Sequence, residues 1–449
     1  MVLRRFAEFA VAERERGLSP EVQQAANRAV VDWFAATVAG SGMDAARIMR
    51  ATLLDGEGAE GPCRLVPGGE RTSARTAALI NATASHIAEM DDIFREGIYH
   101  PGSPTVGAVL AAAELTGASG ADVLRAVAVG YEIGDRIAEA MQPAHYTYWH
   151  TTGTVGTIGA AAGAAELLRL DAEQFAHALA TATTMAAGLQ QAFRSDAMSK
   201  PLHAGHAAEQ GLLAAQLAAQ GFTGALDVLD GEAGFGAAMG KSPDWDAAVA
   251  KLGSPWGVTT ATVKNHSCCG HTFAAVDAAL VLRAQGVSAE DVREIRVATY
   301  TTATKVAGNP DPKTAFEAKF STAYCVAAAL ALGSVRLRAF EDERLSDPLL
   351  RDLVKRTTVV ADPQYDAAFP GKRAARVTVV DGSGTEHEYV RTTRKGDPDD
   401  PLTDAELREK FDDLTTPVLG EAGAAELSAA LWALPELADI RRLTGIGAP

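Results

Sequence analysis

The sequence predicts a mostly α-helical protein with a large all-helical domain, residues 1–263 plus 396–449, and a smaller α+β domain, residues 264–395, inserted between its two parts. Three observations lead to this prediction. The chain has 449 residues, more than the roughly 250–300 at which a single hydrophobic core usually stops growing. Patterns typical of helices follow one another through the first part of the chain, and patterns typical of strands begin only after Val263.

The helices of the first part are predicted from their end signals and from their small residues. The segment after Ser19 is the clearest case, because Ser19 can cap a helix, Pro20 suits its first turn, and Gly40 or Gly42 can end it. Small residues, as in VGTIGAAAGAAELL, let helix axes approach closely, so we expect a tight, largely buried bundle. Further helices are predicted at 72–90, 104–116, 120–141, 154–169, 171–192 and 204–220.

The second part contains the predicted strands. VREIRVATY (292–300) and RTTVVAD (356–362) are typical of strands, and residues 375–393 are typical of a hairpin with DGSG as its turn. STAYCVAAALALG and DERLSDPLLRDLVKR are predicted helices between them. KGDPDDP then forms a linker, and Thr403 with Glu406 makes a capping box for a returning helix. Two shorter helices, near 420–432 and 434–443, complete the helical domain.

The composition narrows the classes of partner and compartment. Lys and Arg number 41 against 57 Asp and Glu, a net charge of −16 that disfavours nucleic acid and anionic membranes as partners. Four cysteines in a chain of this size make no disulfide framework. We recognise no signal peptide and no apolar run long enough to span a membrane, so we predict a soluble, cytoplasmic protein. An anionic substrate would need a locally basic pocket.

The stretch KNHSCCGHTFAAVDAA, which begins at Lys264, contains residues typical of zinc ligands. His266 and His271 satisfy an H-x₄-H spacing, but the adjacent Cys268 and Cys269 are poorly placed to bind the same ion, and no second ligand pair lies elsewhere. We therefore predict no metal site here. The cysteines are better explained as small buried hydrophobic residues.

Histidines also stand at three junctions between a loop and the start of a helix. Free amides and the helix dipole make such junctions favourable for anions. A single histidine there is more often a cap or a surface residue, but three such junctions together with Lys264 predict a pocket for a polycarboxylate. The residues concerned are His100, His145, His150, Lys200, His203 and His206. No nucleophile elbow and no phosphate-binding loop are present in the sequence.

Four stretches resemble a known family when they are taken in order. They are HIAEMDDIFREGIYHPGSPTVGAVLAAAE, KPLHAGHAAEQGLLAAQLAAQGFTG, VKNHSCCGHTFAAVDAA and FSTAYCVAAALALG. In this order they are similar to the MmgE/PrpD family, which includes 2-methylcitrate dehydratase, cis-aconitate decarboxylase and iminodisuccinate epimerase. The resemblance covers nearly the whole chain. It implies that the α+β domain is a lid, that the protein is a homodimer, and that the active site lies in the cleft and uses no metal and no organic cofactor.

The resemblance also implies roles for individual residues. By their place in the motifs, the catalytic residues are His100, His150, Lys200, Lys264 and Tyr324. The substrate-binding residues are Glu89, Asp91, Asp92, His203, His266 and His271. Where family members commonly have LDFDDT, this chain has AEMDDI, so Glu89 replaces the first aspartate and Ile93 replaces a polar threonine. Asp91 and Asp92 would orient a histidine or shape the loop, with a plain helix cap as the alternative.

These observations favour a cofactor-independent lyase that dehydrates a small hydroxy di- or tricarboxylate after removing a proton next to a carboxylate. Lysines would stabilise the negative charge that develops, and a histidine would exchange the proton near neutral pH. Tyr324 would act as an acid on the opposite face. Three alternatives stay open: epimerisation of a dicarboxylate, decarboxylation of the cis-aconitate type, and a binding scaffold without catalysis.

Overall fold

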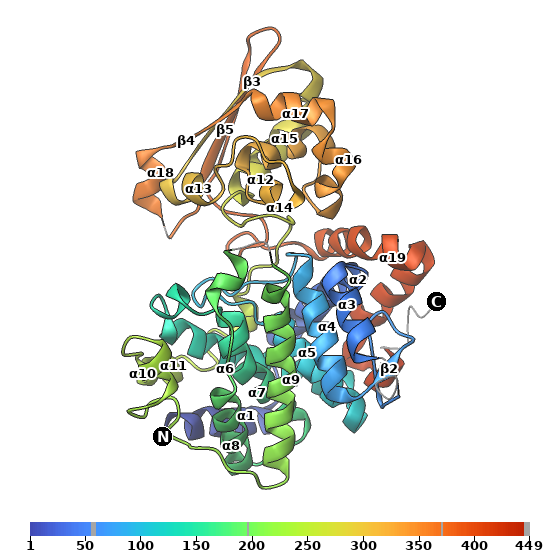
Figure 1. Cartoon of the computed structure of the whole chain (residues 1–449), viewed down its shortest axis with the longest axis vertical. Coiled ribbons are helices and arrows are strands. Elements are labelled where there is room, and N and C mark those ends of the chain that lie inside the picture. Colours follow the sequence, from blue (N-terminus) through green and yellow to red (C-terminus); the bar gives the residue numbers. More distant parts are fainter. Residues whose placement is uncertain (55–59, 195–196, 370, 444–449) are drawn as a thin grey trace. The chain divides into compact units, whose positions relative to one another are not determined.

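The computed structural model describes residues 1–54, 60–194, 197–369 and 371–443, and the chain forms two compact units (Figure 1). The helical unit comprises Met1–Val263 and Thr403–Pro449, and the sheet unit comprises Lys264–Leu402. The prediction of a mostly α-helical protein with a small sheet-containing domain is confirmed. The chain returns to the helical unit at Thr403, which caps the last long helix, whereas the sequence had suggested residue 396.

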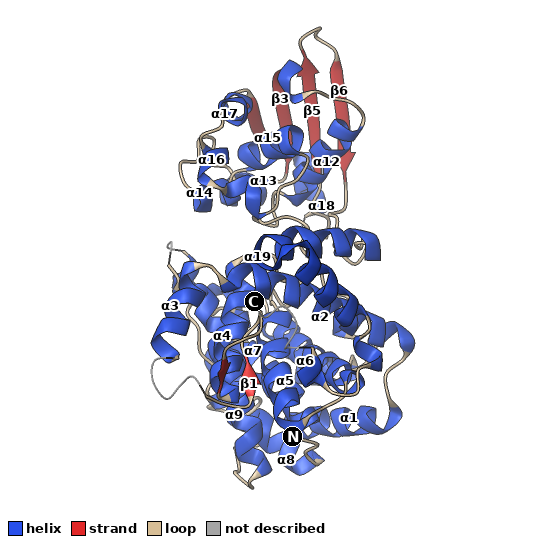
Figure 2. Ribbon diagram, turned by 90° about the vertical axis from the view of Figure 1, so that its right-hand side faces the viewer, coloured by secondary structure: helices blue, strands red, loops and turns tan. Residues whose placement is uncertain are grey.

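Among the described residues of the helical unit, the regular elements are helices apart from one short hairpin (Figure 2). The glycine-rich helix α7 is central, because all of its residues are buried, and it packs against α5, α6, α8 and α9. The elements are α1 (Val2–Arg16), α2 (Pro20–Ser41), α3 (Asp44–Leu53), β1 (Cys63–Arg64), β2 (Arg71–Thr72), α4 (Ala74–Ile87), α5 (Gly102–Thr116), α6 (Gly120–Met141), α7 (Thr151–Leu167), α8 (Ala172–Thr184), α9 (Ser199–Ala219), α10 (Phe235–Met239), α11 (Trp245–Ala250) and α19 (Asp404–Trp432).

The predicted ends of α2 are confirmed, since Ser19 caps it and Gly42 follows it. The start of α9 differs from the prediction, which began the helix at residue 204 and treated the preceding residues as a loop. The helix begins at Ser199 and includes Pro201. Proline is tolerated there because a main-chain N–H in the first turn of a helix has no helical partner. Gly205 is a close approach rather than a loop signal, because a Cβ atom there would lie 2.1 Å from Thr83 Oγ1 on α4.

Helix α19 returns from the sheet unit and packs along α2. The predicted capping box of Thr403 and Glu406 is present at its start. Gly420, with a φ of 70°, and Pro417 interrupt the helix, so that the predicted shorter helix near 420–432 follows as its second half. No helix in the described part of the chain is long and apolar enough to cross a membrane.

The sheet unit has four strands in the order β4-β3-β5-β6, with helices against one face (Figure 2). The predicted strands and the hairpin between Asp381 and Glu386 are confirmed; β3 pairs parallel with β4 and antiparallel with β5. One predicted helix is split, because Pro348 begins a new helix that Asp347 caps. The elements are α12 (Phe273–Ala284), β3 (Val292–Thr299), α13 (Thr301–Val306), α14 (Ala315–Lys319), α15 (Thr322–Leu332), α16 (Asp342–Leu345), α17 (Pro348–Lys355), β4 (Thr357–Ala361), α18 (Pro363–Ala368), β5 (Ala375–Asp381) and β6 (Glu386–Arg391).

Candidate functional site

The loop between α4 and α5 positions most of the candidate residues of the helical unit. Two short pairings hold this loop: the N–H and carbonyl of Ile93 bond to Thr262 at 2.9 and 2.7 Å, and Phe94 bonds to Tyr99 at 2.7 Å. The N–H of His100 also donates to Thr152 Oγ1 on α7 at 3.2 Å. The loop is therefore a fixed part of the unit, although it contains no regular secondary structure.

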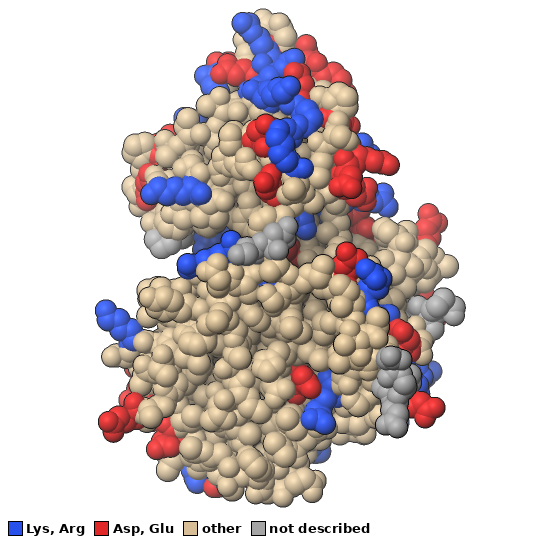
Figure 3. Space-filling view, in the orientation of Figure 1, with Lys and Arg blue, Asp and Glu red and all other residues tan. Residues whose placement is uncertain are grey.

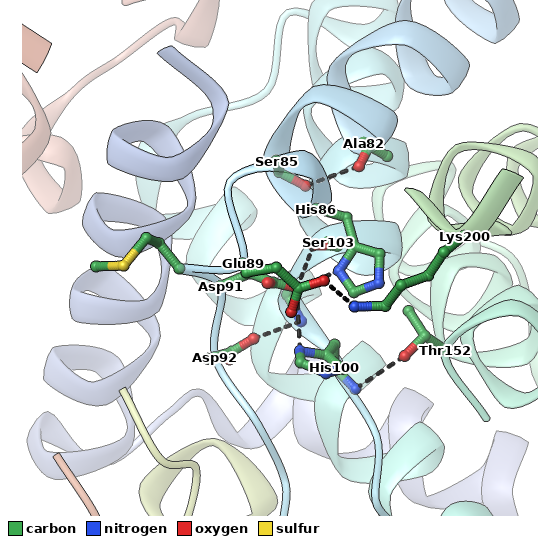
Figure 4. Close-up of polar contacts among 12 residues, drawn as sticks. Ala82, Ser85, His86, Glu89, Asp91, Asp92, His100, Ser103, Thr152 and Lys200 are labelled. Atoms are coloured by element: carbon green, nitrogen blue, oxygen red, sulfur yellow. Dashed lines mark hydrogen bonds and ion pairs between the residues drawn. The ribbon is translucent and has the colours of Figure 1, made fainter. Parts of the chain in front are cut away.

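Asp91 lies at the centre of the site (Figure 4). Its Oδ2 atom is 2.6 Å from His86 Nδ1, accepts a hydrogen bond from Ser103 Oγ at 2.9 Å, and is 3.1 Å from His100 Nδ1. Its burial acts to raise the pKa of Asp91, but the two imidazoles hold that pKa well below its usual value. Asp91 is therefore an ionised carboxylate between two histidines.

This arrangement sets the tautomer of His100. An imidazole that points Nδ1 at a carboxylate keeps its proton on that nitrogen, which leaves Nε2 as the basic atom. His100 retains 14% side-chain exposure while the Asp91 side chain retains 2%. A reacting group can therefore reach the imidazole, and the carboxylate behind it is shielded from water. Asp91 and His100 have the geometry of an orienting carboxylate and a general acid or base.

Asp92 points to the other side of the loop and has a different environment. It accepts hydrogen bonds from the Tyr131 hydroxyl at 2.7 Å and from the N–H of Gly102 at 3.1 Å. Burial raises the pKa of Asp92 to about 7, with a further contribution from Asp32 and Asp91. Gly102 has no room for a side chain, since a Cβ atom would lie 2.6 Å from the Tyr131 hydroxyl oxygen. Asp92 therefore shapes the start of α5, and it is Asp91 that meets the histidines.

Lys200 and Glu89 form an ion pair beside this cluster (Figure 4). Lys200 lies in the first turn of α9, and its ammonium contacts Glu89 Oε1. Glu89 has a left-handed backbone with a φ of 58°. Both side chains remain partly exposed. Lys200 therefore offers an accessible positive charge, which Glu89 neutralises in part.

Two further histidines adjoin the cluster. His150 occupies the N-cap position of α7 without a side-chain capping bond. Its ring stacks on His86 with centroids 5.5 Å apart, and its Nδ1 lies 3.0 Å from Nδ1 of His203. Burial lowers the pKa of His150 well below its usual value and lowers that of His203 to about 4. Both rings are therefore neutral at pH 7. One Nδ1 donates and the other accepts, so the two rings hold complementary tautomers.

The sheet unit contains the other predicted site residues. Lys264 is buried. His266 Nε2 lies 2.8 Å from Asp277 Oδ1, and His271 Nδ1 lies 2.7 Å from the Tyr300 hydroxyl oxygen. Burial lowers the pKa of His271 to about 4, helped by two nearby arginines.

Tyr324 and the predicted buried cysteines belong to the sheet-unit core or its margin. The hydroxyl of Tyr324 donates to the carbonyl of Ala339 at 2.7 Å, and burial raises its pKa. Cys268 and Cys325 are buried, as the sequence predicted, whereas Cys269 is partly exposed. Tyr324 therefore has a structural hydrogen bond within its own unit.

One group of three potential metal ligands is present among the described residues, and it is not the predicted Cys/His stretch. It consists of His86, Asp91 and His100, whose ligand atoms lie within 4.8 Å of one another. A zinc ion would lie about 2.0–2.2 Å from each ligand atom. The 2.6 Å separation of His86 Nδ1 and Asp91 Oδ2 is instead a hydrogen-bond distance, with a proton between the two atoms. The arrangement fits a hydrogen-bonded cluster better than an ion site.

Sequence reasoning missed His86 and Ser103. His86 lies in the last turn of α4, five residues before Asp91, and nothing in the helical pattern distinguishes it from a core residue. Its Nε2 is buried and has no hydrogen-bond partner among the described residues. The signal that could have identified it is a polar ring on the buried face of a helix that leads directly into an acidic loop.

Comparisons with known proteins cover most of the chain. A model of the MmgE/PrpD N-terminal domain matches residues 4–248, and a model of the MmgE/PrpD C-terminal domain matches residues 266–434. A cis-aconitate decarboxylase-like protein, oryM of Aspergillus oryzae, is 29% identical over 95% of this chain and 93% of its own length. The cis-aconitate decarboxylase of Aspergillus terreus is 27% identical over 85% and 83%, and that of Mus musculus is 28% identical over 82% and 77%.

Proposed function

The chain belongs to the MmgE/PrpD family, and from that premise we propose that it is a lyase that removes carbon dioxide from a small tricarboxylate of the cis-aconitate type. The relatives described above that align over most of the chain are named as cis-aconitate decarboxylases or as similar to them. This supports decarboxylation ahead of the dehydration that the sequence favoured. Both are lyase reactions, and both need a proton transfer at a carbon next to a carboxylate.

The observation that carries this proposal is the single oxygen of Asp91 that faces two imidazoles. In the proposed reaction the bond between carbon and one carboxylate breaks and carbon dioxide leaves with no electrons from that bond. The electron pair moves to the carbon skeleton, and a carbon next to a remaining carboxylate takes a proton from the imidazolium of His100. Ionised Asp91 stabilises this imidazolium before transfer, and water then restores the proton.

Positive charge near the site supports the same proposal. Negative charge builds beside the remaining carboxylates as carbon dioxide leaves, so cations placed there stabilise the transition state. Lys200, beside the cluster, is the candidate in the helical unit. Lys264 of the sheet unit is proposed as a second cation from its place in the family motif alone. His150 and His203 are neutral, so we assign them hydrogen bonds to substrate oxygens rather than a fixed charge.

Proton NMR in deuterium oxide tests the reaction. The purified protein is mixed separately with cis-aconitate, with citrate-type hydroxy acids and with succinate-type acids. Release of carbon dioxide with one deuterium placed in each product supports the proposal. Loss or gain of water without carbon dioxide identifies a dehydratase, and deuterium exchange without either identifies an epimerase. Binding of these acids without any turnover identifies a scaffold.

We also propose that the protein is a homodimer. In the view of Figure 3, the surface over α9 has few charged side chains. Large apolar side chains are exposed in the helical unit at Tyr148, Leu189, Met198 and Leu202. The N–H of Gln190, which follows Leu189, donates to the carbonyl of Tyr148 at 2.9 Å, and Met198 and Leu202 lie one turn apart at the start of α9. Light scattering that reports a monomer at micromolar concentration would contradict this proposal, and Leu202→Glu should weaken the dimer.

A further inference from the structure

A third lysine, Lys410, contacts the loop between α4 and α5 and is not part of the site described above. Lys410 is on α19 and is fully buried, although lysine is rarely buried without a partner. Its ammonium donates to Asp32 Oδ1 on α2 at 2.5 Å and to the main-chain carbonyl of Met90 at 2.8 Å. Asp32 and Met90 are also buried. One cation thus joins three segments that are far apart in the sequence.

The carbonyl that Lys410 binds belongs to the residue between two site residues. Met90 separates Glu89, which pairs with Lys200, from Asp91, which faces His86 and His100. The backbone of Glu89 has a φ of 58°, a conformation that side-chain-bearing residues adopt rarely and that the surroundings must hold in place. The hydrogen bond from Lys410 acts on the peptide group between Met90 and Asp91, one residue after this position.

We infer that Lys410 is a positioning residue, which fixes the Met90 peptide so that Glu89 turns to Lys200 and Asp91 turns to the two histidines. The inference rests on the proposed function only in naming what this geometry serves. Lys410 is not a catalytic residue, because it acts through the loop and its ammonium is fully buried. The chain's last long helix would therefore complete a site whose acid, base and cation come from earlier segments.

The rival explanation is an ordinary buried ion pair that contributes to stability alone. Burial raises the pKa of Asp32, and the Lys410 ammonium opposes that rise, so the two groups depend on one another. Removing one partner of such a pair is strongly destabilising, whereas replacing both by neutral groups of similar size is often tolerated. This difference allows stability to be separated from positioning.

The experiment compares Lys410→Met with the double variant Asp32→Asn plus Lys410→Met. The single variant should lose stability, and the double variant should recover much of it, because no unpaired charge is left. Methionine at position 410 offers no donor to the Met90 carbonyl in either variant. For the double variant we expect kcat to fall at least tenfold with KM changed less than threefold. We also expect the imidazole NMR signals of His86 and His100 to shift in the protein without substrate.

The control is Arg14→Met plus Glu166→Gln, which removes another ion pair with a buried carboxylate in the helical unit. It should lower stability and leave kcat and the histidine signals as they are. A double variant with wild-type kcat and wild-type histidine signals would overturn the inference. If the wild-type protein turns over no carboxylate, the proposed function fails, and the histidine signals still decide whether Lys410 positions the loop.

Discussion

Both units of the molecule place histidines next to hydrogen-bonding oxygens. In the helical unit two histidines face the same carboxylate oxygen, whereas His266 and His271 of the sheet unit have separate partners. In the helical unit, Oδ2 of Asp91 faces His86 and His100 and accepts from Ser103. In the sheet unit, each histidine has its own partner. Asp277 uses one oxygen for His266 and the other for the N–H of Lys395, and Tyr300 meets His271.

The difference shows that a dense run of histidines, cysteines and lysine in the sequence does not by itself predict a cluster whose side chains share a partner. The stretch from Lys264 to His271 contains one lysine, two histidines and two cysteines within eight residues. Two of its side chains, however, make local pairs with buried residues of the same unit. The cluster around Asp91 comes from a helix end, a loop and the next helix, and its members interact with one another. Paired variants of Asp91 and Asp277, and of His100 and His271, test whether that contrast also holds for catalysis, and variants of Asp92 and Tyr324 test the stability of each unit.

Asp91→Asn should have the largest effect. The amide keeps the shape of the side chain but removes the negative charge that both imidazoles face. We expect kcat to fall about 10³-fold, within the range found for general acid–base groups. Steady-state kinetics on the substrate found by NMR gives the value, and circular dichroism checks the fold. The matched variant Asp277→Asn should change kcat less than fivefold, and equal losses in the two would remove the contrast.

His100→Gln should have the second largest effect. Glutamine can still donate to Asp91, but it cannot exchange a proton near neutral pH, so kcat should fall about 10²-fold. His271→Gln, which breaks the pair with Tyr300, is the comparison in the sheet unit. It should lower thermal stability with little change in kcat. A large loss of kcat in His271→Gln with His100→Gln unaffected would reverse the assignment.

Asp92→Asn should change the pH dependence of stability. The pKa of Asp92 is raised from 3.8 to about 7, so between these values the folded protein binds a proton that the unfolded chain does not. The stability that Asp92 contributes is therefore present at low pH and is lost as pH rises through 7. Relative to Asp92→Asn, the wild type should lose about 3 kcal/mol between pH 5 and pH 8. Urea unfolding at several pH values measures this, and a constant difference would contradict it.

Tyr324→Phe should have the smallest effect. The change removes the hydrogen bond to the carbonyl of Ala339 and leaves the ring in place, so we expect a loss of about 1 kcal/mol in unfolding free energy. The catalytic role that the family resemblance implies for Tyr324 makes a different prediction. A fall of tenfold or more in kcat at unchanged stability would restore Tyr324 to the catalytic set.

The fold was largely predictable because local signals and packing agree. Hydrophobic alternation and turn residues located every strand of the larger sheet, and capping residues located the starts of α2 and α19. The start of α9 was misjudged because Pro201 and Gly205 have local meanings that tertiary packing overrides. Pro201 is tolerated in a first turn, and Gly205 is required by the closeness of α4.

The candidate site was predictable only in part. His100, Asp91 and Lys200 were nominated, and the structure brings them to the same region of the helical unit. His86 and Lys410 were not, because a buried polar residue within a regular helix looks like any other position until its partner is known. Lys410 lies 320 residues from the carbonyl that it binds, a separation that no local pattern encodes.

The bond between Lys410 and Met90 also bears on how the chain reaches its working form. Domains generally form as units while the chain emerges from the ribosome, with earlier segments first. The loop that contains Asp91 is synthesised long before Lys410, so nascent chains pass through a period in which the histidines exist and this tether does not. Maturation of the loop must therefore wait for one of the last helices to be made.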